Sequence, residues 1–165
     1  MGAQAEPWLR GTHTESSATQ RAVVHALELA QEDLQKWCGE LNDAQLNDTR
    51  GNLAPVAFHL RHIAGSMDRL LSYAEGKQLS AEQMETLKTE NAPGARRDEV
   101  FAQLNAALEK AIARVKAFPV AELEQSRTVG KKQLPTSVAG LLVHVADHTQ
   151  RHVGQAITTA KLVSQ

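Results

Sequence analysis

Three histidines recur at every fourth position near the end of the chain: His144, His148 and His152. On a helix, four residues turn the side chain by only about 40°, so the three imidazoles are expected to line one side, one turn apart. Two histidines at this spacing can hold one metal ion. The row therefore predicts a metal site with the nitrogen ligands that zinc and other transition metals accept.

One helix does not complete such a site, because bundle proteins build metal sites from side chains on facing helices. A second pair, His59 and His62, lies in another apolar-periodic segment. On the last helix, His152 falls close to the centre of the apolar stripe, His148 on its flank and His144 further out. On the earlier helix His59 is nearer the apolar centre than His62. Periodicity alone therefore favours His59 as the third ligand.

The elements that must position these residues are helices. Four long segments repeat apolar residues every three or four positions, as amphipathic helices do; they cover about residues 17–41, 52–76, 98–119 and 135–162. We expect Trp37 in the core stripe of the first and Asp98 or a neighbour as the cap of the third. This pattern predicts an all-α four-helix bundle formed by one domain, residues 1–165.

The connections contain smaller features. Ser80 begins a capping box, which predicts a short extra helix to about Glu90. Residues 120–134 are expected to form a small hairpin or an irregular loop before the last helix. Residues 1–15 look like an extended lead-in, and residues 42–52 like a polar turn.

Composition narrows the function classes. The 165 residues carry a net charge of -1 and only 4% aromatics, which argues against binding to nucleic acids. No apolar run is long enough to cross a membrane, and the N-terminus lacks the pattern of a signal peptide. The one cysteine, Cys38, is expected to pack as a small hydrophobe. We expect a cytoplasmic protein with a small-molecule substrate, and a homodimer is compatible with a bundle of this size.

Two short motifs resemble those of a known family. The run His62-Ile63-Ala64-Gly65-Ser66, followed far downstream by His148-x-x-x-His152-Val153-Gly154-Gln155, resembles the DinB/YfiT-like superfamily of metal-binding four-helix bundles. The resemblance implies that the metal ligands are His62, His148 and His152, in place of the His59 that periodicity favours. Relatives include transferases and isomerases that depend on bacillithiol or mycothiol, which implies a low-molecular-weight thiol as a second cofactor.

These observations lead to three functional hypotheses. The first is a metal-dependent, thiol-dependent S-transferase-like enzyme, with zinc as the first choice of ion and nickel as the second, in which His144 or His59 assists proton transfer as a catalytic residue. The second is a non-catalytic bundle whose metal is structural or sensory. The third is a metal-dependent hydrolase. His13 and His25 are expected to lie on the surface.

Overall fold

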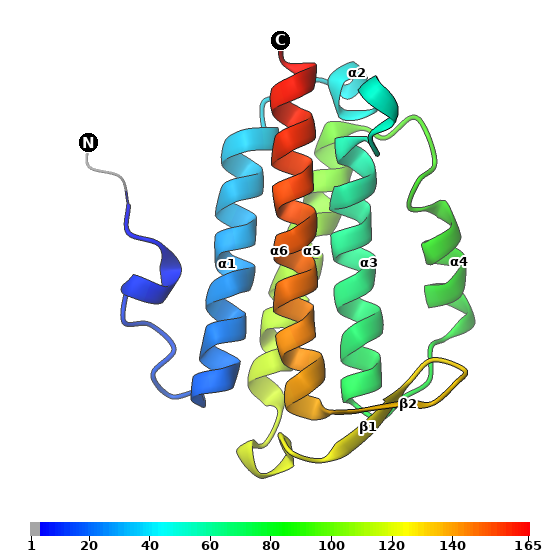
Figure 1. Cartoon of the computed structure of the whole chain (residues 1–165). Coiled ribbons are helices and arrows are strands. Elements are labelled where there is room, and N and C mark those ends of the chain that lie inside the picture. Colours follow the sequence, from blue (N-terminus) through cyan, green and yellow to red (C-terminus); the bar gives the residue numbers. More distant parts are fainter. Residues whose placement is uncertain (1–3) are drawn as a thin grey trace.

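The computed structural model describes residues 4–165 and is mostly helical (Figure 1). The long helices are α1 (Ala18–Cys38), α3 (Val56–Ala74), α5 (Arg97–Ala117) and α6 (Val138–Val163). The smaller elements are α2 (Asp43–Leu46), α4 (Ala81–Thr89), strands β1 (Ser126–Val129) and β2 (Leu134–Ser137), and three 3₁₀ turns, η1 (Pro7–Leu9), η2 (Arg50–Asn52) and η3 (Val120–Glu122). In this part of the chain no helix is both long and apolar enough to cross a membrane.

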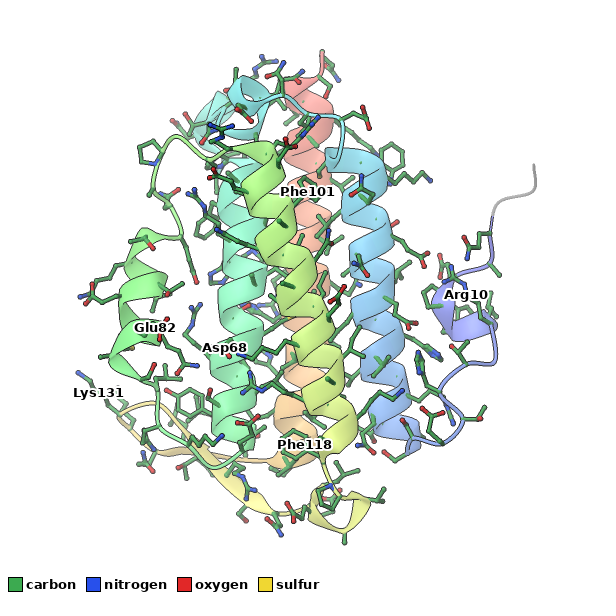
Figure 2. The ribbon with its side chains drawn as sticks, turned by 180° about the vertical axis from the view of Figure 1, so that it is seen from behind. Arg10, Asp68, Glu82, Phe101, Phe118 and Lys131 are labelled. Atoms are coloured by element: carbon green, nitrogen blue, oxygen red, sulfur yellow. The ribbon has the colours of Figure 1, made fainter. Side chains whose placement is uncertain are left out.

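The four long helices lie side by side, and Figure 2 shows them from behind with α5 in front. Helices α1 and α3 each contact both α5 and α6. All four contribute fully buried leucines to one apolar cluster, such as Leu27, Leu60, Leu104 and Leu142. The helical class predicted from periodicity is therefore correct.

Serine side chains begin three of the helices. Ser17 and Ser137 each accept a hydrogen bond from a backbone N–H in the first turn, and Ser80 forms the predicted capping box with Gln83. These bonds satisfy N–H groups that have no partner within the helix. The starts of α1 and α4 agree with the prediction, whereas residues 135–137 belong to β2 and α6 begins three residues later than expected, at Val138.

The segment before α6 folds as a hairpin, one of the two alternatives left open. Strands β1 and β2 pair antiparallel, from Ser126 opposite Ser137 to Val129 opposite Leu134. The hairpin lies at the end of the long helices (Figure 1). Arg127 Nε donates to the carbonyl of Ala74 at 2.7 Å, so the hairpin also satisfies the last turn of α3.

The stretch 42–52 contains a short helix that the polar-turn prediction missed. Asn42 and Gln45 form a capping box at the start of α2. Asp43 then accepts a hydrogen bond from the backbone N–H of Arg97 at 2.8 Å. Asp98 therefore does not cap α5: the first N–H group of that helix is satisfied by a carboxylate far away in the sequence.

Within the described part of the lead-in, residues 4–15, the chain is not fully extended. Pro7–Leu9 form the turn η1, which contacts α1. Pro7 is buried, whereas Trp8 and Leu9 are exposed. The remaining lead-in residues, 1–3, lie outside the described part of the chain.

Trp37 is exposed, contrary to its expected place in the core. The buried row on α1 continues from Leu34 to Cys38, one position past the tryptophan. The Trp37 ring lies instead beneath the ammonium groups of Lys36 and Lys161, at 4.9 and 4.3 Å from its centroid. Cys38 is fully buried, as expected, and burial raises the pKa of its thiol to about 12.

Gln20 connects two long helices at the end nearest the hairpin. Its buried amide Nε2 donates to the carbonyls of Val115 and Phe118, both at 2.9 Å, beyond which Pro119 prevents α5 from continuing. These carbonyls have no partner within α5. The side chain therefore fixes the start of α1 against the end of α5.

We predict that Gln20→Leu lowers the free energy of unfolding by roughly 2 kcal/mol, because it leaves two carbonyls without their donor. Denaturant titration followed by circular dichroism measures the change. The exposed Gln103 on α5 provides the control, since Gln103→Leu is expected to change stability by less than about 0.5 kcal/mol. Equal stability of the Gln20 variant and the parent would contradict this role.

Candidate metal centre

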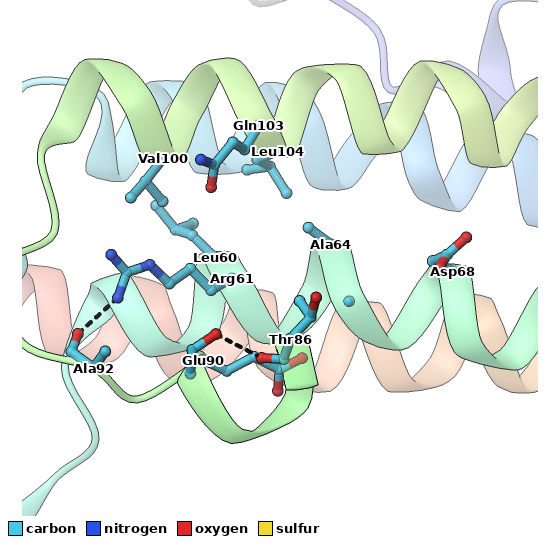
Figure 3. Close-up of a pocket in the computed structure, with 12 residues that line it drawn as sticks. Leu60, Arg61, Ala64, Asp68, Thr86, Glu90, Ala92, Val100, Gln103 and Leu104 are labelled. Atoms are coloured by element: carbon cyan, nitrogen blue, oxygen red, sulfur yellow. Dashed lines mark hydrogen bonds between the residues drawn. The ribbon is translucent and has the colours of Figure 1, made fainter. Parts of the chain in front are cut away.

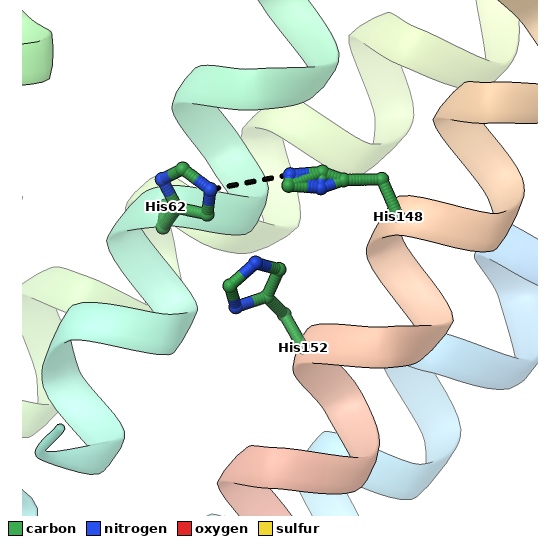
Figure 4. Close-up of side chains that lie close together, drawn as sticks. All are labelled: His62, His148 and His152. Carbon is green, nitrogen blue, oxygen red and sulfur yellow. Dashed lines mark hydrogen bonds between the residues drawn. The ribbon is translucent and has the colours of Figure 1, made fainter. Parts of the chain in front are cut away.

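Helices α3 and α6 bring three histidines together across their contact (Figure 4). His62 comes from α3, and His148 and His152 come from successive turns of α6. Each offers one ring nitrogen, and these nitrogens all lie within 4.8 Å of one another. We call this set the histidine triad. It is the ligand set implied by the family resemblance.

The spacing fits a divalent ion. His62 Nε2 and His148 Nε2 are 3.2 Å apart. Two nitrogens bound tetrahedrally to one zinc ion, each at about 2.0–2.1 Å, are separated by roughly 3.3 Å. All three rings are partly exposed, so the site is accessible from solvent.

A buried carboxylate orients His62 from behind. His62 Nδ1 lies 2.7 Å from Glu90 Oε2, and Arg69 donates to the other carboxylate oxygen at 2.7 Å. The Glu90 and Arg69 side chains are 2% and 9% exposed. Because an ionised carboxylate only accepts hydrogen bonds, the His62 hydrogen lies on Nδ1 and the Nε2 lone pair points into the triad.

Glu90 reaches His62 because α3 carries no side chain at Gly65. A Cβ atom there would overlap Glu90 Oε1 and crowd Arg69 Nη1 at 2.7 Å. Glu90 also lines a pocket of about 460 Å³ between α3, α4 and α5 (Figure 3). No triad histidine lines that pocket, which lies on the far side of Glu90 from the imidazoles.

His59 contacts the triad without belonging to it. The ring is 5% exposed, and its Nδ1 lies 3.0 Å from His152 Nδ1. This contact occupies one nitrogen of His152 and leaves Nε2 for an ion. The periodicity that favoured His59 correctly indicated its burial, but the structure gives this residue a supporting position one ring behind the triad.

Burial keeps these imidazoles neutral. Burial first, and then the neighbouring histidines, lower the pKa of His59 and of His152 to about 4. The pKa of His148 is lowered too, first by burial and then by His144 and His62. Neutral rings present the lone pairs that a metal requires.

His148 contains an unpaired polar atom. Among the described residues, Nδ1 of its ring is buried without a hydrogen-bond partner. Buried polar atoms in folded proteins nearly always have a partner. Two imidazole nitrogens that face each other at 3.2 Å need a proton or a cation between them. A bound ion between the two Nε2 atoms would accept both lone pairs, so that each ring could keep its hydrogen on Nδ1.

His144 lies at the rim. Its side chain is 47% exposed, and Nδ1 lies 2.8 Å from Asp147 Oδ1. The ring stacks on His148 with centroids 5.5 Å apart. It therefore adjoins the triad without joining it, at the exposed end of the histidine row.

Sequence reasoning missed three contributors. Phe58 stacks on His62 with centroids 5.2 Å apart, Glu90 contacts Nδ1 of the same ring, and Arg69 donates to Glu90. The aromatic ring at i−4 from His62 was a usable signal. Glu90 gave none, since its contact depends on how α4 packs against α3. Ser66, four residues after His62, donates to the Ile63 carbonyl of its own helix.

A second pocket, of about 530 Å³, opens beside His152. It lies between the residues leading into α3 and the outer face of α6. Its lining is largely apolar near Leu53 and Phe58, with Arg151 as the one basic side chain. This pocket is large enough for a small organic molecule next to the triad.

The expected surface positions of His13 and His25 are wrong in part. His25 is 7% exposed, on the face of α1 that the N-terminal segment covers, and the His13 side chain is 19% exposed. Both rings are covered where residues 10–16 fold back onto α1. Neither lies in the histidine triad.

The metal-free protein is expected to lose stability in acid. The unfolded chain protonates His59 and His152 from about pH 6.5 downward, whereas the folded chain does so only near pH 4. Stability is therefore retained above the unfolded pKa and lost as pH falls through this window. Urea titrations at several pH values measure it. A His59→Gln/His152→Gln variant should show a shallower dependence, and an unchanged slope would contradict this assignment.

Glu90→Gln is expected to weaken Zn²⁺ binding by roughly 10–100-fold, because His62 loses a charged acceptor. Competition against a chromophoric chelator measures the affinity. Glu85→Gln is the matched control, since Glu85 is exposed on α4 and forms an ion pair with Lys88. Equal affinities of the two variants would show that Glu90 does not support the site.

Comparison with known proteins agrees with this arrangement. The model of the DinB superfamily matches residues 26–156, a span that includes the whole histidine triad, Glu90 and Arg69. A comparison with curated proteins gave no match. Because the match covers more than half of the chain, the protein belongs to the DinB superfamily.

Proposed function

We propose that the protein is a metal-dependent enzyme that transfers a low-molecular-weight thiol to an electrophilic small molecule. The observation that carries the proposal is the histidine triad itself: three solvent-accessible imidazoles, without a fourth protein ligand among the described residues of the cluster. Three protein ligands are typical of catalytic zinc, and four of structural zinc. We infer also that the four long helices form the four-helix bundle of the family.

The residues of the site would have two roles, metal binding and orientation of the metal-binding rings. His62, His148 and His152 would hold the ion, with zinc the first choice and nickel the second. When bound, a divalent ion stabilises an incoming thiol as its thiolate. His59 and Glu90 fix the rings of His152 and His62, so that the three lone pairs converge.

His144 at the rim would supply a proton acceptor, and the neighbouring pocket would supply a binding place for the electrophile. His144, paired with Asp147 at the exposed edge, is placed to receive the thiol proton and pass it to solvent. The pocket beside His152 would hold the electrophile, with Arg151 near any anionic group that it carries. The thiolate sulfur donates the electron pair of the new carbon–sulfur bond. In a substitution the electron pair of the broken bond leaves with the leaving group, and in an addition the displaced π electron pair stays on the acceptor.

Two other functions remain as alternatives. A metal-dependent hydrolase would use the same open position to activate water. A structural or sensory site would bind the ion without turnover. The accessible pocket beside His152 favours the two enzymes over a structural or sensory site, and the family resemblance favours the thiol over water.

We predict that His148→Ala/His152→Ala removes one tightly bound metal equivalent from the purified protein, because a single remaining ligand cannot retain the ion. Elemental analysis measures this. His144→Ala is the matched control on the same helix: it should keep the metal and lower the turnover rate by roughly 100-fold, the size of a general-base contribution. Equal metal in the double variant and the parent would remove the proposed site.

The same proteins separate the functional classes. Thiol-dependent loss of an electrophile, catalysed by the metal-loaded parent, supports the transferase. Ester hydrolysis without thiol would replace it with the hydrolase. Metal binding with neither activity, together with loss of the fold on chelation, would replace both with a structural site.

A further inference from the structure

A second group of metal-binding side chains lies where the N-terminal segment folds back onto α1. It consists of His13, His25 and Glu28, whose ligating atoms all lie within 4.8 Å of one another. His13 and His25 both precede residue 26, where the match to the DinB superfamily begins. The group is therefore largely a feature of this chain outside the matched region.

Helix α1 and the turn before it place these three residues. His25 and Glu28 are three positions apart, so they share a face of α1. His13 has a φ of 58°, in the left-handed region that few non-glycine residues adopt, and its carbonyl accepts from the N–H of Ser16 at 3.0 Å. This turn directs the imidazole back to the helix, where Nε2 lies 2.7 Å from Glu28 Oε1.

The neighbouring residues orient both rings. Thr12 Oγ1 lies 3.0 Å from His25 Nε2, which gives this nearly buried imidazole a polar neighbour. On the outer side, Lys116 Nζ lies 3.2 Å from His13 Nδ1 and 2.8 Å from Glu15. The ammonium group donates to the nitrogen of His13 that faces away from the cluster, so the ring hydrogen lies on Nε2, beside Glu28. An ion at Nε2 requires this hydrogen to move to Nδ1, and Lys116 would then keep only its pair with Glu15.

The donor set is one that proteins use for transition metals. Two imidazoles and one carboxylate hold catalytic zinc and non-haem iron, and hard or intermediate ions accept this mixture of nitrogen and oxygen. Glu28 supplies a negative charge from a side chain that is 27% exposed, so an ion can enter from solvent. A hydrogen on His13 Nε2 occupies the place beside Glu28 that a divalent ion would take.

We propose that His13, His25 and Glu28 form a second divalent-metal site, separate from the histidine triad, that fixes the N-terminal segment to α1. The segment already contacts the helix through Arg10, which pairs with both carboxylate oxygens of Glu32 at 2.6 and 2.8 Å (Figure 2). The ion would add a second connection to α1, through metal coordination at His13, three residues after Arg10. Zn²⁺ is the ion whose usual ligands match this set.

Zn²⁺ titration of the full chain tests the site in a His148→Ala/His152→Ala background, which disables the triad. One equivalent is expected to bind, and adding His13→Ala or Glu28→Gln should weaken it by at least roughly tenfold. Glu28→Gln preserves size and can still accept from His13, and circular dichroism verifies the fold of each variant. Absence of stoichiometric binding in the background overturns the proposal.

A matched variant identifies which residues hold the ion. Adding His62→Ala to the same background should leave the affinity unchanged, because His62 belongs to the other site. If His62→Ala abolishes binding while His13→Ala does not, the ion is held by the remains of the triad and the proposal is wrong.

Trypsin cleavage after Arg10 gives a second readout. Zn²⁺ is expected to slow this cleavage in the background protein by at least roughly tenfold, since the ion restrains the adjacent chain, and to have no effect once His13→Ala is present. A cleavage rate that does not respond to Zn²⁺ would show that the ion, even if bound, does not fix the segment.

Discussion

The packing of α3 against α6 is the contact on which the metal centre depends. His62 and His148 are far apart in the sequence, yet their Nε2 atoms lie 3.2 Å apart because buried apolar residues of the two helices hold the backbones together. Leu60 and Ile63 flank His62, and Val145 and Val153 flank the histidines of α6, all of them at most 2% exposed. The polar cluster is thus a narrow strip along an otherwise apolar seam, and its geometry is set by the core.

That position imposes an electrostatic constraint. A seam between apolar helices disfavours charge, so burial keeps His59 and His152 neutral at physiological pH. The one full charge behind the triad, on Glu90, is matched by Arg69 at 2.7 Å. Glu90 therefore orients the ring of His62 from behind the triad. Because Arg69 pairs with Glu90, the two side chains together add no net charge to the interior.

The sequence was informative where a local pattern decides the structure. Apolar periodicity located the long helices, and the histidine spacing with the family motif identified the set that the structure brings together. Periodicity alone chose His59 over His62, because burial on a helical wheel does not say which buried ring faces a partner. Asp43 at the start of α5 and Glu90 behind His62 could not be predicted, since each acts across a contact that exists only after folding.

Gly65 sets a limit on how the chain can vary. At Gly65, about one turn after His62 on α3, there is no space for even one methyl group beside Glu90 and Arg69. Replacement of Gly65 by a small apolar residue would displace Glu90 and Arg69, and it would thereby change the position of the His62 imidazole. Among related chains, a larger residue at this position should therefore be accompanied by a shorter acid or a displaced α4, so that the two positions change together.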